Sequence, residues 1–298
     1  MNDKDILQRF IFENAAVRGE IVHLNDSFQT IMQQHDYPSI IRRLLGEVLV
    51  AASLLSATIK YQGRLTVQFQ GKNKLKLLLA QCDSQFHLRG LAQWDGELNE
   101  AELLTLLTQG ILVITIDPES GGKRYQGIVE WQGKSIAQSI EGYFNNSEQL
   151  PTRLWLAVND EQGVGLLLQA MPIASGPSKS QHGHTSHDWE HLMHLTGTVT
   201  QNELLKLDTQ QLLHRLYHQE DVRLFPSVPV MFQCTCSVEK SENAILFLGP
   251  DEVEQELKEK QKLVVTCEFC NKAFAFDRVD VAKIFKKGNK PSSSTQIH

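Results

Sequence analysis

The sequence predicts an α+β protein in three parts: an N-terminal α+β domain over residues 1–172, a flexible segment with a helical linker region over 173–230, and a small C-terminal domain over 231–298. In the first part, segments with a two-residue apolar period alternate with segments of three- and four-residue spacing, which is typical of this class. Between 172 and 187 the composition shifts to Ser, Gly, Pro, Lys and His, as in a linker. Further on, four of the five cysteines fall within 234–270.

Composition and charge describe a soluble globular protein. The chain has 298 residues, of which 41% are hydrophobic and 21% charged, so it is long enough to bury a sizeable core. A net charge of −6 argues against a nucleic-acid-binding protein, because phosphate contacts need a basic face. The first residues, Met-Asn-Asp-Lys-Asp, lack the pattern of a signal peptide, and the apolar stretch 44–59 contains Glu47 and is too short for a membrane span. We therefore expect a cytoplasmic protein with no membrane partner.

The first part begins with strands and one long helix. Residues 5–23 alternate loosely between apolar and polar side chains, which predicts strands, with Gly19 at a bend or bulge. From Pro38 to about Ile59, apolar residues recur every three or four positions, which predicts a helix that begins at the proline. From Arg64 the period changes to two, and we expect strands there and over 75–82 and 86–94.

Segments with a two-residue apolar period and segments with a three- to four-residue apolar period both continue to the end of the first part. The further elements that we expect are helices over 100–107 and 135–144, the second ended by Asn145-Asn146, strands over 111–116 and 127–131, and a hairpin of 155–158 and 164–169. Because helices and strands are interspersed in this way, the sequence favours the α+β class over an all-α or all-β domain.

Helix signals dominate residues 188–222. Thr200 and Glu203 have the spacing of a capping box, in which each side chain bonds the other residue's backbone. Asp208 stands where a cap would begin a second helix. One face of that helix is apolar and carries Leu212, Leu213, Leu216 and Tyr217. We expect a small helical region between the first part and the C-terminal domain.

The cysteines form two closely spaced pairs, Cys234-Thr-Cys236 and Cys267-Glu-Phe-Cys270, with residues 237–266 between them. A tetrahedral metal ion needs four ligands at one point, and one tight turn can present only two. Two such pairs are therefore typical of a thiolate zinc site. The sequence predicts one zinc ion per reduced chain, bound by all four of these cysteines and by no histidine. A helix that begins at Pro250 is expected to bridge the two pairs.

Other uses of these cysteines are less well supported. Structural disulfides are disfavoured because the cytosol keeps thiols reduced, and a thioredoxin-type CxxC would need a βαβ context that Phe269 and Asn271-Lys272 do not offer. A purely structural zinc ribbon remains open. Only one residue separates Cys234 from Cys236, whereas zinc ribbons usually have two or more residues between paired ligands. A disulfide between these two cysteines would be strained and labile. The short spacing of the first pair therefore favours a site whose cysteines cycle between zinc-bound thiolates and disulfides.

The segment Phe232-Gln-Cys-Thr-Cys-Ser237, followed after the intervening residues by Cys-Glu-Phe-Cys, resembles the redox-switch domain of the 33 kDa heat-shock chaperonin family. The likeness extends over nearly the whole chain. Upstream segments in the family's order are Val17-Arg-Gly-Glu20, Tyr37-Pro38, Leu45-Gly-Glu47, Gln68-Phe-Gln-Gly71, Arg89-Gly90, Tyr143-Phe144 and Ser147-Glu-Gln-Leu-Pro-Thr152.

The resemblance implies a function that the cysteine spacing alone does not. It implies a redox-regulated, ATP-independent holdase chaperone that binds unfolding proteins in the stress response and is a homodimer when oxidised. Residues 231–298 would be a zinc-binding redox-switch domain, switched on by disulfides Cys234–Cys236 and Cys267–Cys270 with release of zinc. The linker region would then loosen, and the apolar face at 212–217 is a candidate surface for binding client proteins.

Two functions from other classes are also compatible with parts of the sequence. One is a zinc-ribbon interaction or regulatory module with a purely structural metal. The other is a metallohydrolase, because His187-Asp-Trp-Glu190-His191 matches the HxxEH pattern among other histidines at 182–194. No buried scaffold for that motif is evident, and no GxGxxG or Walker sequence supports nucleotide hydrolysis. We expect no enzyme activity, and Cys82, within an apolar strand pattern, is expected to be an inert buried thiol.

Overall fold

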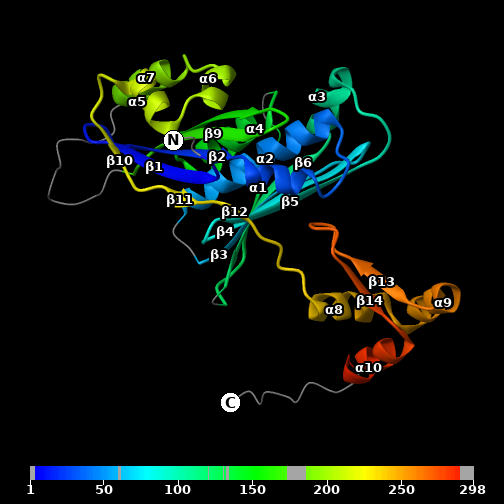
Figure 1. Ribbon diagram of the computed structural model, residues 1–298. Coiled ribbons are helices and arrows are strands. Elements are labelled where there is room, and N and C mark those ends of the chain that lie inside the picture. The colour runs from blue at the N-terminus through cyan, green and yellow to red at the C-terminus, as the bar shows by residue number, and fades with distance from the viewer. Residues whose placement is uncertain are drawn as a thin grey trace. The chain divides into compact units, whose positions relative to one another are not determined.

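The computed structural model describes residues 4–59, 62–119, 121–129, 131, 134–172 and 186–288. It separates two compact units, Met1–Gln233 and Cys234–His298 (Figure 1). Helices and strands are interspersed in both, which confirms the α+β class. The predicted flexible segment falls mainly on 173–185, which lie outside the described residues. The three-part division at 172 and 230 stays a prediction beside these two units.

Helix α2 (Ser39–Thr58) is the centre of the first unit. Every residue from Val48 to Thr58 is buried, so the helix is enclosed on all sides. Its core cluster combines Leu7 and Val22 of one sheet with Val67 of another. The helix predicted to begin at Pro38 is confirmed, with that proline as the residue before its first turn. Among the described residues no helix is both long and apolar enough to cross a membrane.

Two six-stranded sheets enclose α2. The first has the order β10-β1-β2-β9-β8 with β11 beside β1, and its strands are β1 (Ile6–Phe12), β2 (Val17–Leu24), β8 (Thr152–Val158), β9 (Gly163–Ala170), β10 (Val222–Leu224) and β11 (Val228–Pro229). The second has the order β12-β5-β4-β3-β6-β7, with β3 (Gly63–Gln70), β4 (Leu75–Asp83), β5 (His87–Trp94), β6 (Ile111–Pro118), β7 (Tyr125–Val129) and β12 (Met231–Phe232). A Cβ on Gly165 would lie 2.3 Å from Val50 Cγ1, so β9 and α2 touch closely at this glycine.

The opposite face of the first sheet is covered by three short helices, α5 (Ser186–Thr196), α6 (Gln201–Lys206) and α7 (Thr209–Tyr217) (Figure 1). They share a second core cluster with Phe10, Ile21 and Leu166. Both predicted caps are confirmed: Thr200 with Glu203 and Asp208 with Gln211 each form a capping box. The predicted apolar face of α7 is therefore part of a core here, and its residues Leu212, Leu213, Leu216 and Tyr217 are at most 7% exposed.

Several local expectations differ from the structure. Gly19 lies within the unbroken strand β2, and its Cβ would be 2.2 Å from Phe10 Cζ, so glycine makes room for a ring and forms no bulge. Helix α4 (Ile136–Tyr143) is not ended by Asn145-Asn146, because the chain continues in a π-turn over Phe144–Glu148. Helix α1 (Asp26–Met32) was not predicted, whereas α3 (Glu100–Thr108) was.

The second unit is a small α+β fold of α8 (Val238–Leu248), α9 (Pro250–Lys260), β13 (Leu263–Thr266), β14 (Ala273–Phe276) and α10 (Arg278–Gly288). Helix α8 was not predicted, and it is separated from the predicted helix α9 by Gly249 at a φ of 91°, which favours glycine. Pro250 opens the second helix as predicted. Eight buried apolar residues form the core: Ile245, Val253, Leu257, Leu263, Phe274, Phe276, Val281 and Ile284.

The enclosure of α2 makes a stability prediction. Leu49→Ala removes a fully buried side chain, and we expect it to lower the free energy of unfolding of the first unit by about 2–5 kcal/mol. Leu104→Ala, at a position 42% exposed on α3, is the matched control and should change it by about 0.5 kcal/mol. All four tryptophans lie in the first unit, so their fluorescence during urea unfolding reports on that unit. Equal losses for both variants would contradict this description of the core.

Candidate metal centre

The first cysteine pair lies in an extended segment that leads directly into α8. Ser237 is the N-terminal cap of that helix and its side chain accepts a hydrogen bond from Lys240 N. Lys240 Nζ in turn donates to Thr235 O, between the two cysteines, at 2.6 Å. Cys236 also packs against the small apolar core. The pair is thus positioned by a helix start, whose partial positive charge favours thiolates nearby.

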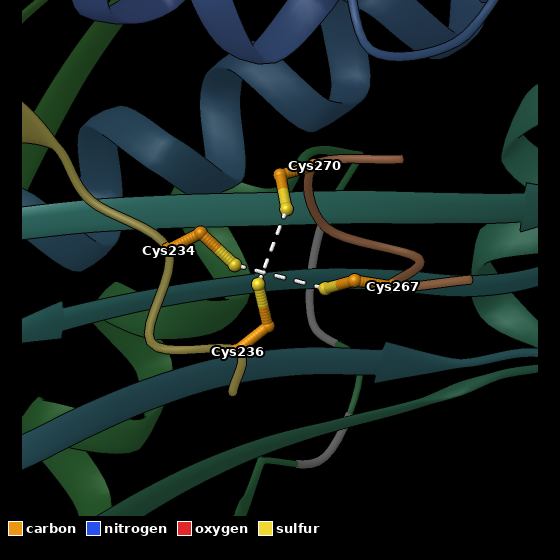
Figure 2. Close-up of side chains that lie close together, drawn as sticks. All are labelled: Cys234, Cys236, Cys267 and Cys270. Atoms are coloured by element: carbon orange, nitrogen blue, oxygen red, sulfur yellow. Dashed lines mark hydrogen bonds between the residues drawn. The ribbon is translucent and has the colours of Figure 1, made fainter. Parts of the chain in front are cut away.

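The second pair lies in the turn between β13 and β14. Cys267 O accepts hydrogen bonds from Cys270 N at 3.3 Å and from Asn271 N at 2.8 Å, and Cys267 N donates to Lys272 O at 3.0 Å. Asn271 has a φ of 51°, in the left-handed region that asparagine tolerates better than most residues. These bonds close the turn tightly and direct both thiols to one side of it (Figure 2).

The four sulfur atoms converge (Figure 2). Cys234 Sγ lies 3.6 Å from Cys267 Sγ, Cys236 Sγ lies 3.5 Å from Cys270 Sγ, and all four lie within 4.8 Å of one another. A tetrahedral ion with metal–sulfur bonds of about 2.3 Å has sulfur–sulfur edges of about 3.8 Å. The arrangement therefore fits a four-coordinate ion that accepts sulfur ligands, and these cysteines could hold one.

The pKa values of Cys234, Cys236 and Cys270 are shifted in different directions. Burial raises the pKa of Cys234, but the Cys236 backbone N–H and the neighbouring thiols donate to its sulfur and lower the pKa overall. Burial raises the pKa of Cys236, and it raises that of Cys270 to about 12. Without a cation the cluster thus favours a thiolate at Cys234 over one at Cys236 or Cys270, because like charges this close repel. A divalent ion reverses that preference by binding the deprotonated sulfurs.

The fifth thiol lies elsewhere. Cys82 is on β4 in the first unit, is fully buried, and has its pKa raised to about 12 by burial. Its Sγ lies 3.7 Å from Asp83 O. The expectation that this cysteine is buried is confirmed, and its high pKa leaves almost no reactive thiolate at neutral pH.

The HxxEH segment forms no comparable centre in the part of the chain that the structure describes. There, no other group of three or more His, Cys, Asp or Glu side chains gathers as closely as the four cysteines. The side chain of His187 is exposed on α5, and His191 Nε2 lies 2.8 Å from Glu220 Oε1. His182 and His184 lie outside the described residues.

Sequence reasoning missed the residues that hold the cysteine segments in place. Ser237 was not predicted to cap a helix, although a serine before an amphipathic stretch is a common helix start. Asn271 directly follows the second pair, and asparagine after a tight turn is a usual sign of left-handed backbone. Lys240 has no such signal, because its bond to Thr235 depends on the folded geometry.

Comparisons of the sequence and of the fold with known proteins all match the same family. A family model described as Hsp33 protein matches residues 5–277. The chain is 47% identical over 294 residues to the 33 kDa chaperonin of Shewanella sp. (strain MR-4), covering 98% of this chain and 99% of that one. It is 44% identical over 301 residues to the 33 kDa chaperonin of Azotobacter vinelandii, covering 100% of both. The crystal structure of the 33 kDa chaperonin from Thermotoga maritima has the same fold, with a TM-score of 0.78 at 19% identity over 95% of this chain and 99% of that one.

The burial of the thiols predicts their reactivity. In metal-free, reduced protein at pH 8, we expect a maleimide to modify the four clustered thiols quickly, in the native chain, and Cys82 only after denaturation. Cys82 is fully buried, whereas the four clustered cysteines are partly exposed, so the reagent can reach them without unfolding the first unit. Mass spectrometry of the labelled protein gives the count, and Cys82→Ser is the control that should keep all four fast thiols. Five fast thiols in the native chain would contradict the assignment of Cys82 to a closed core.

Proposed function

The chain belongs to the Hsp33 family of chaperones, and on that premise we propose that it is a redox-regulated, ATP-independent holdase with a cysteine-bound zinc ion as its switch. The observation that carries the proposal is the convergence of four sulfur atoms from two segments of one small unit. Conversion of those sulfurs to disulfides would remove every ligand at once.

In the reduced state Cys234, Cys236, Cys267 and Cys270 would hold one zinc ion as thiolates. Four sulfur ligands in a tetrahedral arrangement suit zinc better than the hard cations magnesium and calcium. Zinc sites of this type supply on the order of 10 kcal/mol at neutral pH. The apolar core of the second unit has eight buried residues. We infer that thiolate ligation contributes a large share of the order in this unit.

Oxidation would remove the contribution that thiolate ligation makes to the order of the second unit. Each pair of thiolates passes two electrons to a peroxide, which takes up two protons and leaves as two molecules of water, and one S–S bond forms. All four sulfurs are close in the cluster, so its geometry does not select partners. Once the metal leaves, loop closure favours neighbours in sequence, which supports Cys234–Cys236 and Cys267–Cys270 as the pairs. The disulfide-bonded sulfurs can no longer bind as thiolates, and the unit loses its ordering energy.

The route to client binding would run through the segment between α7 and Cys234. Its strands β10, β11 and β12 have three, two and two residues and pair at the edges of β1 and β5. Such short edge strands are weakly held, and we propose that disorder in the second unit spreads through them to 188–222. Loss of α7 from its core would expose Leu212, Leu213, Leu216 and Tyr217 to unfolding proteins.

We also propose the clients, the oligomeric state and the location of this activity. Clients are unfolded or partly unfolded proteins under oxidative stress, the oxidised form is a homodimer, and the protein acts in the cytoplasm without nucleic acid or membrane. Homodimerisation follows the same logic as client binding, because two copies with exposed apolar faces can cover part of that surface against each other. No enzymatic step is assigned to any residue.

One observation favours a second reading, a zinc-ribbon interaction module whose metal is purely structural. Phe247 on α8 is 93% exposed, and large exposed apolar side chains often mark interaction surfaces. In that case Cys236 and its partners would keep their metal under mild oxidation. The two readings differ in what peroxide does to the metal.

We expect the reduced protein to contain one zinc ion per chain and to release it on treatment with peroxide, with the loss of four titratable thiols. Metal analysis and thiol counting on the same samples measure both quantities. His187→Ala/His191→Ala is the control and should keep the full zinc content, because no histidine is a ligand. Retention of zinc after peroxide would favour the ribbon module, and zinc loss in the histidine variant would contradict the four-cysteine site.

Removal of one ligand should imitate oxidation. In Cys267→Ser we expect faster hydrogen exchange over 234–288 and over 188–222, while 62–119 stays protected because its core does not involve the metal. The variant should also suppress aggregation of a heat-unfolded client, at least partly, without oxidant. Cys82→Ser serves as the control with wild-type exchange. An inactive Cys267→Ser protein with a demonstrably unfolded second unit would show that the disulfides themselves are required.

A further inference from the structure

A cavity of about 260 Å³ in the first unit has no part in the redox switch. It lies where β1, β2, the C-terminal end of α2 and the turn before β5 meet. Its walls mix charged and aromatic side chains, and the residues that matter most are Arg9, Arg18, Glu20, Thr58, Phe86 and Phe225. Typical ligand pockets measure about 300–1,000 Å³, so this one would take only a small molecule.

Two buried polar atoms at this cavity have no hydrogen-bond partner. Arg18 and Glu20 are two residues apart on β2 and therefore point to the same face of the sheet. An Nη atom of Arg18 donates to Thr58 O at 2.9 Å and to Gln169 Oε1 at 2.5 Å, but Arg18 Nε has no partner. Glu20 is 1% exposed, and its Oε2 has no partner among the described residues either. Buried donors and acceptors are nearly always paired, so these two atoms leave one donor and one acceptor open to a further polar partner.

The charges around the cavity do not cancel. The acceptors of Arg18 at Thr58 and Gln169 are both neutral, and within the described residues no carboxylate forms an ion pair with Arg18. Arg9 stands opposite Glu20 in the strand register, is exposed, and has its guanidinium over the Phe86 ring, 5.9 Å from the centroid. Burial raises the pKa of Glu20 to about 7, against the lowering effect of Arg18 and Arg9. Two cations thus face one carboxyl that is protonated in about half of the molecules at pH 7.

We propose that this cavity binds a small oxyanion, a carboxylate or a phosphate, whose oxygens accept hydrogen bonds from Arg18 Nε–H and from the protonated Glu20 carboxyl. Arg9 at the mouth adds a second positive charge. Phe86 and Phe225 would contact the apolar part of an organic acid. Water alone satisfies the hydrogen bonds but leaves the two guanidinium charges of Arg18 and Arg9 against the single, partly protonated Glu20 carboxyl, which is why an anion fits better than solvent.

The test uses the reduced full chain and three probes: benzoate, inorganic phosphate, and benzamide as the neutral analogue of benzoate. Isothermal titration calorimetry should show saturable binding of benzoate or of phosphate, and which of them binds distinguishes an organic acid from a phosphate as the ligand. Benzamide should not bind. Affinity for the anion should rise as the pH falls from 8 to 6, by at most about tenfold per pH unit, because the bound state takes up a proton on Glu20. The charged residues lining the cavity are Arg9, Arg18 and Glu20, and the arginines keep their charge throughout this range.

Variants separate this proposal from its rivals. Glu20→Gln keeps a donor in place of the protonated carboxyl, so it should retain binding and lose the pH dependence. Arg18→Gln should weaken binding at least tenfold, and Arg9→Gln, at the exposed mouth, should weaken it severalfold without altering the fold as judged by tryptophan fluorescence. The Arg9 variant keeps the test valid if Arg18→Gln does not fold. Loss of binding in Glu20→Gln, equal binding of benzamide, or no binding of either anion at millimolar concentration to the folded wild-type chain would overturn the proposal.

Discussion

In the C-terminal unit four sulfur atoms meet at one point, and the proposed switch depends on this convergence. They come from two segments separated by residues 237–266, and each segment is shaped locally, one by the start of α8 and the other by the turn between β13 and β14. With eight buried apolar residues, the unit has a small core for its length. A metal held by these sulfurs would join the two segments and supply order that the core lacks. Sensitivity to oxidants would then follow from the same chemistry, because the thiolate is both the ligand and the oxidisable form of cysteine.

The first unit depends on a different constraint, the enclosure of α2 between two sheets. Its core is large and contains none of the four clustered cysteines, so it can keep its fold while the other unit loses order. Helices α5, α6 and α7 occupy the far side of the first sheet, and the short strands β10, β11 and β12 connect α7 to Cys234. In the proposed mechanism these weakly paired edge strands would loosen before the central helix is disturbed.

The strongest sequence signals were those with one physical meaning. The apolar period from Pro38 predicted α2, and the spacing of the cysteine pairs predicted that four thiols would meet. The apolar face of α7 had two meanings, because a core face and a client-binding face have the same periodicity, and only packing against Phe10 and Ile21 places it in a core here. Gly249 was not recognised as a break between two helices, because a positive φ leaves no mark beyond the glycine itself. The unpaired atoms of Arg18 and Glu20 are likewise a property of the folded chain alone.

Amide NMR of the reduced protein before and after removal of its metal by a chelator, with reductant present throughout, tests whether metal ligation maintains the fold of the second unit. We expect resonances of 238–288 to collapse to the narrow dispersion of an unfolded chain, while those of 62–119 keep their positions. Because no disulfide can form under these conditions, any change reports on ligation alone. Dispersed, unshifted resonances of 238–288 in the metal-free protein would contradict the claim that four-sulfur ligation maintains the fold of this unit.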